Sequence, residues 1–490
     1  MKKIIFAILA VASLGAQAQK NTFFDQTFWK GSPNVESIKA EIAKGSNPSQ
    51  LNPSSFDAVV YAINSNAPQE SILFLLAQPG NDVNKITHDS RTYLIWAAAR
   101  GNVPVMEYLL KNGAKTDVQD SHGYSALTFA ANAAQPNTKV YDLLIEKGVD
   151  LKKDLNHDGA NALLIAIPND KDFVLTNYFV SKGLDINSKD ANGNTAFNYV
   201  AKSGNIELMN NLIQKGVKYN DNAMLMAAQG GRGTSNSLEV FKYLEGLKIK
   251  PTAIGSNGEN ALSYIVRKPK QEEIINYFLS KGVDVNLADK DGVTPFMIAA
   301  GSNRDLATLE LLSKNVKNIN QVNAKGVSAL HLAVRGNSAE VVQFLLDKGA
   351  DMKAADKNGD NLAYYLLQAY NPRGMEDFEA KFKLLSDKGF DFKAVQPNGN
   401  SLYHLAIAKN DLALLKRIEP LKVDVNLKNK EGYTALHKAA MTAKDAELMK
   451  YLVSIGAKKD VTTEFKETPY DLATENEFLS KNKISIDFLK

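Results

Sequence analysis

Apolar residues recur at helical spacing in short blocks along the chain, and turn residues separate the blocks. In one block Val341 and Val342 lie four and three positions before Leu345, which places them on one face of a helix, and Phe344 and Leu346 flank that face. Blocks of this kind end at a glycine, the residue best suited to a left-handed helix end. These glycines are Gly113, Gly148, Gly183, Gly216, Gly282, Gly349, Gly389 and Gly456. The pattern predicts a chain built from many short helices.

Another helix is predicted in front of each block. It starts after a Thr, Ser, Asn or Asp, which we call the cap residue because its side-chain oxygen can accept a hydrogen bond from the free amides of the first turn. Pro295 and Pro469 follow their cap residues directly, at a position where a missing N–H costs nothing. The cap residues are Asp57, Thr92, Ser125, Asn161, Thr195, Asn222, Asn260, Thr294, Ser328, Asn361, Ser401, Thr434 and Thr468.

The cap residues recur with a mean spacing of about 34 residues. The repeat is clearest in DGVTPFMIAA from Asp291, KGVSALHLA from Lys325 and EGYTALHKAA from Glu431. These stretches resemble the T-P-L-H block of ankyrin repeats, and matches in phase cover about residues 21–475. The resemblance implies an all-α fold, an ankyrin repeat solenoid of helix-turn-helix units with short hairpin loops, in which each unit buries its apolar face against its neighbours.

The pattern divides the chain into four expected parts. These are a signal peptide (residues 1–18), a degenerate N-terminal capping unit (19–50), an array of about 13 units in triplets of about 100 residues (51–475) and a C-terminal cap (476–490).

The triplets rest on residues 177–187 and 276–286, which agree at eight of eleven positions across a shift of 99 residues. Three cap residues in the third place of a triplet are also followed by a tyrosine four positions later, at Tyr61, Tyr264 and Tyr365. Either a partner meets a similar face every three units, or the triplets record a duplication without functional consequence.

The spacing of the cap residues varies at three places. Insertions at residues 230–236 and 371–374 are predicted between the two helices of a unit, where loops are tolerated and often carry function. The 27 residues from Thr195 to Asn222 are too few for a complete hairpin, so the chain is expected to shorten that connection.

The first residues have the pattern of a secretory signal. Two lysines precede an apolar run from Ile4 to Leu14, and small residues around Ala16 and Ala18 predict cleavage before Gln19. Eleven apolar residues are too few to cross a bilayer, which needs about 20. We expect an exported protein with no stable membrane insertion after cleavage, in the periplasm or secreted, and the signal resembles the bacterial type.

Composition excludes several classes of function. The 490 residues hold 58 Lys and Arg against 54 Asp and Glu, a net charge of +4, which disfavours a nucleic-acid binder that depends on bulk positive charge. The chain has no cysteine, which rules out disulfides, thiol nucleophiles and cysteine-ligated metals. No metalloprotease, nucleophile-elbow, phosphate-loop, dinucleotide-binding or kinase motif occurs. We therefore expect no enzyme activity, no cofactor and no metal.

The six histidines fall into two sets. The resemblance implies that His331, His404 and His437 form structural hydrogen bonds in the T-P-L-H block. His88, His122 and His157 lie at successive hairpins, but helical units stack about 8 to 10 Å apart, too far to share one metal ion.

In ankyrin repeat proteins a partner usually binds along the hairpin tips and the exposed end of the first helix of each unit, on the concave face. The resemblance implies hairpin contacts through Arg91, His122, Tyr124, Tyr219, Glu259 and Tyr433. At the far end of the first helices stand the basic residues Arg100, Lys202, Arg267, Lys268, Arg335 and Lys409. They would attract an acidic partner surface. Basic residues are also favoured at a helix C-terminus by the helix dipole alone, so that interpretation stays open.

The sequence thus predicts a monomeric protein-protein interaction scaffold of the bacterial cell envelope. Some periplasmic ankyrin proteins are associated with catalase, so the resemblance suggests an oxidative-stress enzyme as one partner. The alternative is a secreted effector that recognises a protein of a host or target cell.

Overall fold

The structure is a computed structural model that describes residues 21–231 and 235–490, so the predicted signal peptide lies outside it. The chain divides into two compact units, unit 1 up to Ala227 and unit 2 from Ala228, which are described separately. Within the described ranges every regular element is helical, apart from two isolated β-bridges at Ile254–Asn260 and Val322–Ser328. The predicted all-α class is confirmed.

Unit 1 alternates first and second helices of each repeat. The first helices are α3 (Ala58–Asn64), α5 (Tyr93–Ala99), α7 (Ala126–Asn132), α9 (Ala162–Ala166), α11 (Ala196–Ser203) and α13 (Asn222–Gln229), which runs across the boundary. The second helices are α4 (Gln69–Leu76), α6 (Val103–Lys111), α8 (Lys139–Glu146), α10 (Val174–Ser181) and α12 (Ile206–Gln214). Shorter elements are η1 (Thr22–Phe24), α1 (Gln26–Lys30), α2 (Val35–Ala43), η2 (His88–Ser90) and η3 (Ile167–Asn169).

Unit 2 follows the same order. Its first helices are α15 (Leu262–Ile265), α17 (Pro295–Ser302), α19 (Ala329–Gly336), α21 (Leu362–Gln368), α23 (Leu402–Ile407), α25 (Ala435–Thr442) and α27 (Pro469–Glu475). Its second helices are α14 (Leu238–Gly246), α16 (Glu272–Ser280), α18 (Leu306–Ser313), α20 (Ala339–Asp347), α22 (Glu376–Asp387), α24 (Leu412–Ile418), α26 (Glu447–Ser454) and α28 (Glu477–Lys481). The 3-10 turns η4 (Glu419–Leu421) and η5 (Asp487–Leu489) complete it.

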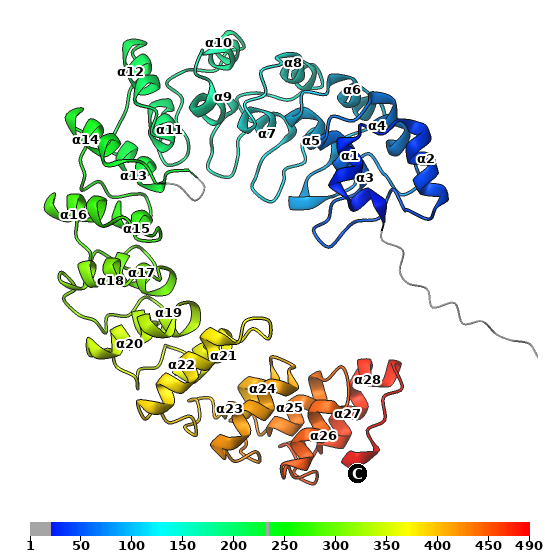
Figure 1. Ribbon diagram of the computed structural model, residues 1–490, viewed down its shortest axis with the longest axis vertical. Helices are drawn as coiled ribbons and strands as arrows, with labels where there is room; N and C mark the ends of the chain where they lie inside the picture. Colours follow the sequence, from blue (N-terminus) through cyan, green and yellow to red (C-terminus); the bar gives the residue numbers. More distant parts are fainter. Residues whose placement is uncertain (1–20, 232–234) are drawn as a thin grey trace, which may run out of the picture. The chain divides into compact units, whose positions relative to one another are not determined.

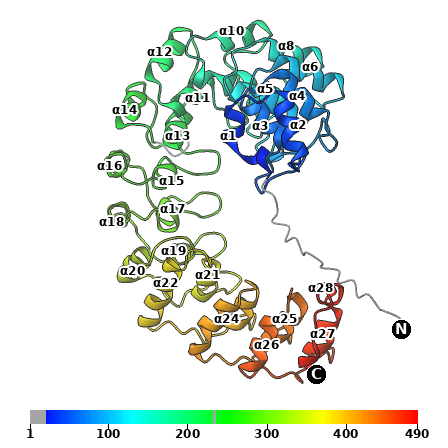
Figure 2. The ribbon, with the colours of Figure 1, turned by 45° about the vertical axis from the view of Figure 1, so that its right-hand side comes forward.

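First helices pack on first helices, and second helices on second helices. In unit 1 α5 contacts α7 and α7 contacts α9, and in unit 2 α17 contacts α19 and α18 contacts α20 (Figure 1). The hairpin loops of unit 2 project beyond α15 and α17 on the side away from α16 and α18 (Figure 2). The core between the two layers holds Val341, Val342 and Leu345, which are fully buried as their spacing predicted, together with aromatic side chains such as Phe278.

Most cap residues act as predicted. A side-chain oxygen accepts a hydrogen bond from a first-turn amide at Asp57, Ser125, Asn161, Thr294, Ser328, Asn361, Thr434 and Thr468. The predicted glycine helix ends are also confirmed, with φ between 78° at Gly216 and 99° at Gly456.

The cap prediction is wrong at Asn222, which is the first residue of α13. The connection before it is shortened, as the spacing predicted, and asparagine side chains take the place of the missing loop. The side-chain amide of Asn222 donates to the carbonyl of Asn192 at 3.0 Å, and Asn220 bridges Gly193 and Asn198. The insertion at residues 371–374 lies between α21 and α22, as predicted. Of the insertion at residues 230–236, residues 232–234 lie outside the described part of the chain.

Candidate functional site

The hairpins between repeats are joined to one another by main-chain hydrogen bonds. In unit 2 the amide of Ala324 donates to the carbonyl of Asp291 at 2.8 Å, and the amide of Lys357 donates to Lys325 at 2.9 Å. Equivalent bonds join Ser121 to Asp89 and Ala191 to Asp158 in unit 1, and Lys290 to Asn257 and Lys430 to Asn398 in unit 2. Neighbouring hairpins are therefore linked directly at these places in both units.

The glycine two positions before the cap residue permits this close approach. A Cβ on Gly292 would lie 2.7 Å from the amide nitrogen of Ala324, and Gly292 has a φ of +78°, which L-residues rarely adopt. At this hairpin only glycine meets both demands, so Gly292 permits the close approach of Ala324.

The structure brings three predicted contact residues together in unit 1. The carboxylate of Asp120 accepts hydrogen bonds from the amides of His122 and Tyr124, both at 2.9 Å, and from Nε of Arg91 at 2.8 Å. Asp89 lies 3.3 Å from Arg91 and 3.6 Å from Nε2 of His122. The His122 side chain is exposed and Tyr124 is half-buried.

Arg91 is engaged in contacts of the fold, and its predicted role in binding a partner is untested. Only 8% of its surface is exposed, because its guanidinium lies over the rings of Trp96 and Phe129, at 4.9 and 4.1 Å from their centroids. Cation–π contacts and the Asp120 ion pair occupy the groups that a partner would need.

We call the predicted basic residues at the far ends of the first helices the basic stripe. Three of them make contacts within the fold. The cations of Arg100, Lys268 and Lys409 reach back to the end of the preceding first helix. Arg100 donates to the Asn64 side chain at 3.0 Å, Lys268 to the Gln229 carbonyl at 2.8 Å, and Lys409 to the Gln368 carbonyl at 3.5 Å. These contacts favour the helix-dipole interpretation for the three residues, since each cation meets the C-terminal end of a helix.

The other members of the stripe point outward. Lys202, Arg267 and Arg335 have exposed side chains near the ends of α11, α15 and α19. The Nε of Arg267 donates to the carbonyl of Ser263 in its own helical turn at 3.2 Å. Their role in binding stays a prediction.

The remaining predicted hairpin residues are spread along the two units. Tyr219 is partly exposed and packs on Phe197, with ring centroids 4.7 Å apart. Glu259 accepts a hydrogen bond from the Tyr264 hydroxyl at 2.8 Å, and burial raises the pKa of Tyr264 to about 12. The Tyr433 ring lies 4.6 Å from the ammonium of Lys438.

Tyr61, Tyr264 and Tyr365, which lie four positions after their cap residues, form hydrogen bonds with residues of their own hairpins. Tyr365 donates to Asp356 at 2.7 Å, and Tyr61 accepts from Asn52 at 3.1 Å. Burial, followed by the bond to Asp356, raises the pKa of Tyr365. Trp96 and Tyr199 make the same contact, with Thr87 and Asp190, in other positions of the triplet. The contact therefore does not distinguish every third unit.

The three histidines of the T-P-L-H block form the hydrogen bonds that the resemblance implied. Nδ1 accepts from the main-chain amide of the cap residue, at 3.2 Å from Ser328 to His331 and at 3.1 Å from Ser401 to His404. His437 is bound to Thr434 in the same way. Burial lowers the pKa of all three imidazoles.

The second set of histidines is not arranged around an ion. His88 stacks on Phe56 with centroids 4.4 Å apart, and its Nδ1 lies 2.8 Å from the Ser54 carbonyl. Over residues 21–231 and 235–490, no three His, Asp or Glu side chains gather in a way that could hold a metal. In the same ranges no helix is long and apolar enough to cross a membrane.

Sequence reasoning missed a row of exposed aliphatic side chains on the hairpins of unit 2. They occupy the sixth position before the cap residue in five successive hairpins, and we call them the ridge: Ile254, Ala288, Val322, Ala355 and Val395. The signal is present in the sequence as an apolar residue directly before the turn residue of each of these hairpins.

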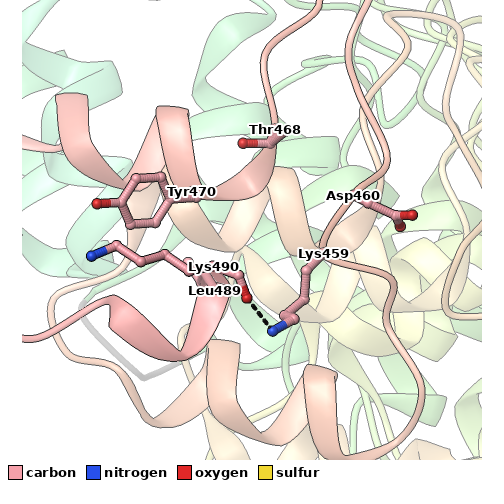
Figure 3. Close-up of a pocket in the computed structure, with 6 residues that line it drawn as sticks. All are labelled: Lys459, Asp460, Thr468, Tyr470, Leu489 and Lys490. Carbon is pink, nitrogen blue, oxygen red and sulfur yellow. Dashed lines mark hydrogen bonds between the residues drawn. The ribbon is translucent and has the colours of Figure 1, made fainter.

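A cavity of about 400 Å³ lies between the last hairpin and the C-terminal segment. Figure 3 shows Lys459 pointing to the main-chain oxygen of Lys490, and its ammonium also donates to the Phe488 carbonyl at 3.2 Å. The ammonium of Lys490 is paired with Asp487 at 2.6 Å. These cations hold the C-terminal segment in place.

The model of the family "Ankyrin repeats (3 copies)" matches residues 59–154, 132–223, 262–356, 352–465 and 403–483, well over half of the chain. The chain therefore belongs to the ankyrin repeat family, whose repeats generally mediate protein-protein interaction. This confirms the class of fold and of function that the cap-residue period implied.

Individual relatives match in part. The chain is 27% identical over 194 residues to human transient receptor potential cation channel subfamily A member 1, covering 38% of this chain and 17% of that one. It is 35% identical over 126 residues to the probable 26S proteasome regulatory subunit p28 of Saccharomyces cerevisiae, covering 24% of this chain and 55% of that one. A stretch of 144 residues, 29% of this chain, is 28% identical to 24% of an L-asparaginase from Dirofilaria immitis.

A solved structure also matches, that of the ankyrin repeat domain of Bcl-3. It is 22% identical, with a TM-score of 0.36, and the match covers 46% of this chain and 98% of that domain. The chain spans between about a sixth and about half of the first two relatives, so their activities and partners do not transfer as whole-protein properties.

Proposed function

We propose that this protein is a non-enzymatic scaffold that binds a partner protein through its hairpin edge and the adjoining ends of its first helices. The observation that carries the proposal is the ladder of main-chain hydrogen bonds between hairpins, such as Ala324 to Asp291. It fixes the spacing of the hairpin side chains in each unit, so a partner finds a surface that is already ordered. A preordered surface lowers the entropy cost of binding.

We propose no catalytic role for the protein. The sequence carries no catalytic motif, and the polar side chains at the hairpins satisfy turn and cap hydrogen bonds of the fold. The match to an L-asparaginase covers a quarter of that enzyme, too little to transfer its reaction.

We also propose where the protein acts and which kind of protein it binds. The N-terminal pattern of two lysines, an apolar run and small residues supports export to the periplasm of a bacterium after cleavage before Gln19. There the protein acts as a monomer on a protein of the envelope, and the resemblance alone makes an oxidative-stress enzyme such as catalase the first partner to test.

The test is affinity capture from a periplasmic extract with the mature chain as bait. A variant with Lys290→Glu, Lys325→Glu and Lys357→Glu reverses charge at three exposed hairpin tips. A matched control carries Lys111→Glu and Lys314→Glu at the ends of second helices, where the side chains are equally exposed. We expect one protein to be retained by the wild type and the control and lost by the hairpin variant. Equal capture by all three baits would contradict binding at the hairpin edge.

The location has its own measurement. Cell fractionation followed by sequencing of the mature N-terminus should find the protein in the periplasmic fraction, beginning at Gln19. An uncleaved chain in the cytoplasmic fraction would overturn the envelope assignment and leave the binding proposal standing.

A further inference from the structure

The ridge of unit 2 differs from scattered surface apolar residues because it repeats. The exposed fraction is 57% at Ile254, 47% at Val322 and 46% at Val395. Ala288 and Ala355 lie between them and are half-buried and exposed, respectively. Single exposed aliphatic residues are common on soluble proteins and need no explanation. Five in succession at one repeat position form a row along neighbouring hairpins, and exposed apolar groups gathered on one surface mark binding sites.

The hairpin contacts align the ridge. Main-chain bonds join the first four of its hairpins in order, through Lys290 to Asn257, Ala324 to Asp291 and Lys357 to Lys325. The fourth and fifth hairpins are joined by the side chain of Gln396, which accepts from the amide of Asn361 and donates to its side chain, both at 2.8 Å. Large and small side chains therefore alternate along one ordered line.

Exposed cations accompany the ridge at the hairpin tips. Lys290, Lys325 and Lys357 stand on three successive hairpins, three or two positions after a ridge residue. Within the part of the chain that the structure describes, none of their ammonium groups has an ion pair or hydrogen bond. The nearby carboxylates of Asp289 and Asp356 accept amide hydrogen bonds of their own turns, at 2.8 to 3.0 Å. The cations are thus available to a partner.

We infer that the ridge and the three tip lysines dock an acidic protein segment that carries aliphatic side chains between its carboxylates. The inference rests on the proposed scaffold function and specifies the partner chemistry of unit 2. Aliphatic side chains of the segment pack beside the ridge alanines, and its carboxylates face the lysines. Repeats stack about 10 Å apart. Three residues of a polyproline II segment cover about 9 Å and bring every third side chain back to the same face, so an apolar residue at every third position of such a segment matches the hairpins.

The test uses a dye-labelled peptide of five Leu-Glu-Glu repeats and the full mature chain, with fluorescence anisotropy as the readout. We expect saturable binding that weakens with added salt. Replacing leucine by serine in the peptide should raise Kd at least about tenfold, because the buried aliphatic contacts are lost. The absence of binding to the Leu-Glu-Glu peptide would overturn the inference.

Matched variants locate the contact. Ile254→Ser, Val322→Ser and Val395→Ser together should raise Kd at least about tenfold without changing the melting temperature, since these side chains are exposed. The control carries Leu51→Ser and Ile86→Ser, which occupy the same hairpin position in unit 1 and are also exposed. It should bind like the wild type. Equal Kd values for the ridge variant and the wild type would place the peptide elsewhere and overturn the inference.

The same set of variants also tests two other occupants of the ridge, a membrane surface and a second copy of the chain. Ridge-dependent co-sedimentation with phosphatidylserine vesicles would assign the ridge to a membrane surface and overturn the inference. A dimer in analytical ultracentrifugation that the ridge variant abolishes would assign it to a second copy of the chain, with the same consequence. If the ridge variant still captures the periplasmic partner and the tip-lysine variant does not, only the ridge inference fails.

Discussion

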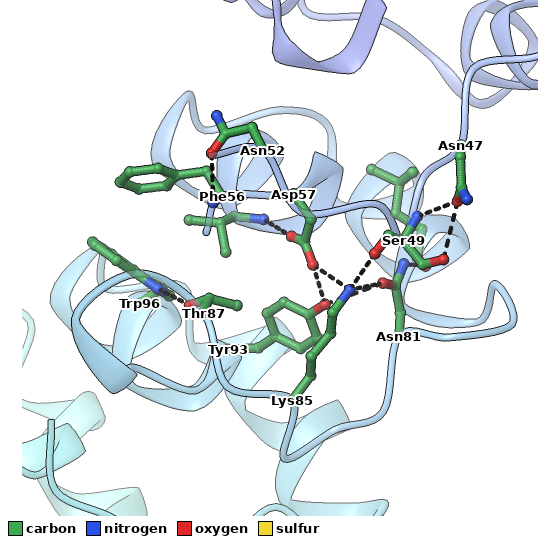
Figure 4. A network of polar contacts seen from close by, with 12 residues as sticks. Asn47, Ser49, Asn52, Phe56, Asp57, Asn81, Lys85, Thr87, Tyr93 and Trp96 are labelled. Atoms are coloured by element: carbon green, nitrogen blue, oxygen red, sulfur yellow. Dashed lines mark hydrogen bonds and ion pairs between the residues drawn. The ribbon is translucent and has the colours of Figure 1, made fainter. Parts of the chain in front are cut away.

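The two units differ in how far charged side chains at their hairpins are buried and paired. In unit 1, two hairpin cations pair with buried carboxylates. Lys85 lies 2.7 Å from Asp57, whose side chain is fully buried, and Arg91 lies 2.8 Å from Asp120. Figure 4 shows Lys85 and Tyr93 converging on the Asp57 carboxylate, and the Tyr93 hydroxyl donates to it at 2.6 Å. Burial, followed by the charge of Asp57, raises the pKa of Tyr93.

In unit 2 the hairpin tips carry lysines that project into solvent beside the ridge, as at Lys325 and Lys357. A buried cation occurs instead between helices. The ammonium of Lys381 in α22, of whose surface 2% is exposed, donates to the carbonyls of Val334 and Asn337 at 2.8 and 2.9 Å.

The difference shows that a charged residue in a hairpin can either pack within the fold or stay exposed to a partner. A hairpin charge that meets an opposite charge and aromatic rings, like Arg91, becomes part of the packing and is lost as a contact for a partner. A hairpin charge without such neighbours stays available for binding. Neighbouring residues, more than the position in the repeat, decide between the two.

The largest effect is expected from Asp57→Ala in unit 1. The substitution removes the partner of Lys85 and the acceptor of Tyr93, and it removes the N-cap of α3, where Asp57 accepts from the Val60 amide at 3.0 Å. Breaking a buried ion pair by removing one partner costs about 3 to 5 kcal/mol. Urea unfolding of the full chain, followed by circular dichroism, measures this loss.

The double variant Asp57→Ala with Lys85→Met is the control. It should recover part of the stability, because the unpaired ammonium is no longer buried. A loss below about 1 kcal/mol in the single variant would be that of a surface pair, and would contradict the contrast between the units.

A smaller effect is expected from Arg91→Gln. Glutamine keeps a polar side chain but has no charge for Asp120 and cannot cover the Trp96 ring, so we expect a loss of about 1.5 to 3 kcal/mol in the free energy of unfolding. Lys325→Gln in unit 2 is the matched substitution at an exposed hairpin and should stay within about 0.5 kcal/mol of the wild type. Equal losses in the two variants would mean that exposure does not separate structural from available hairpin charges.

Much of the fold could be predicted from the sequence because its signals are local. A cap residue such as Thr294, followed by Pro295, fixes a helix start within a few positions, and a glycine such as Gly349 fixes a helix end. The shortened connection before Asn222 was predictable from spacing alone. That Asn222 would begin α13 was not, because it depends on a hydrogen bond to the preceding hairpin.

The candidate site was harder to predict because each side chain contacts a residue about one repeat away. Arg91 meets Asp120, Lys268 meets Gln229 and Lys409 meets Gln368, and nothing next to these residues in the chain indicates the contact. A basic stripe and a set of structural cations therefore look alike in one sequence. Of the predicted basic residues at the ends of the first helices, Lys202, Arg267 and Arg335 remain as exposed candidates.

The smallest expected effect concerns the pH dependence of unit 2. The repeat after α19 has no asparagine where Asn303 and Asn337 bind the carbonyls at the end of a preceding helix, and Lys381 binds such carbonyls instead. Burial lowers the pKa of Lys381 from its usual 10.5. The unfolded chain therefore binds more protons than the folded chain between the lowered pKa and 10.5, and stability rises with pH across that window.

Relative to Lys381→Met, the wild type should gain stability as the pH is raised from 7 towards 10, measured by urea unfolding at each pH. The buried tyrosines titrate in both proteins and cancel in this difference. A constant difference between wild type and variant over the whole range would mean that the Lys381 ammonium is solvated in the folded chain, and would remove the contrast with the paired cations Lys85 and Arg91 of unit 1.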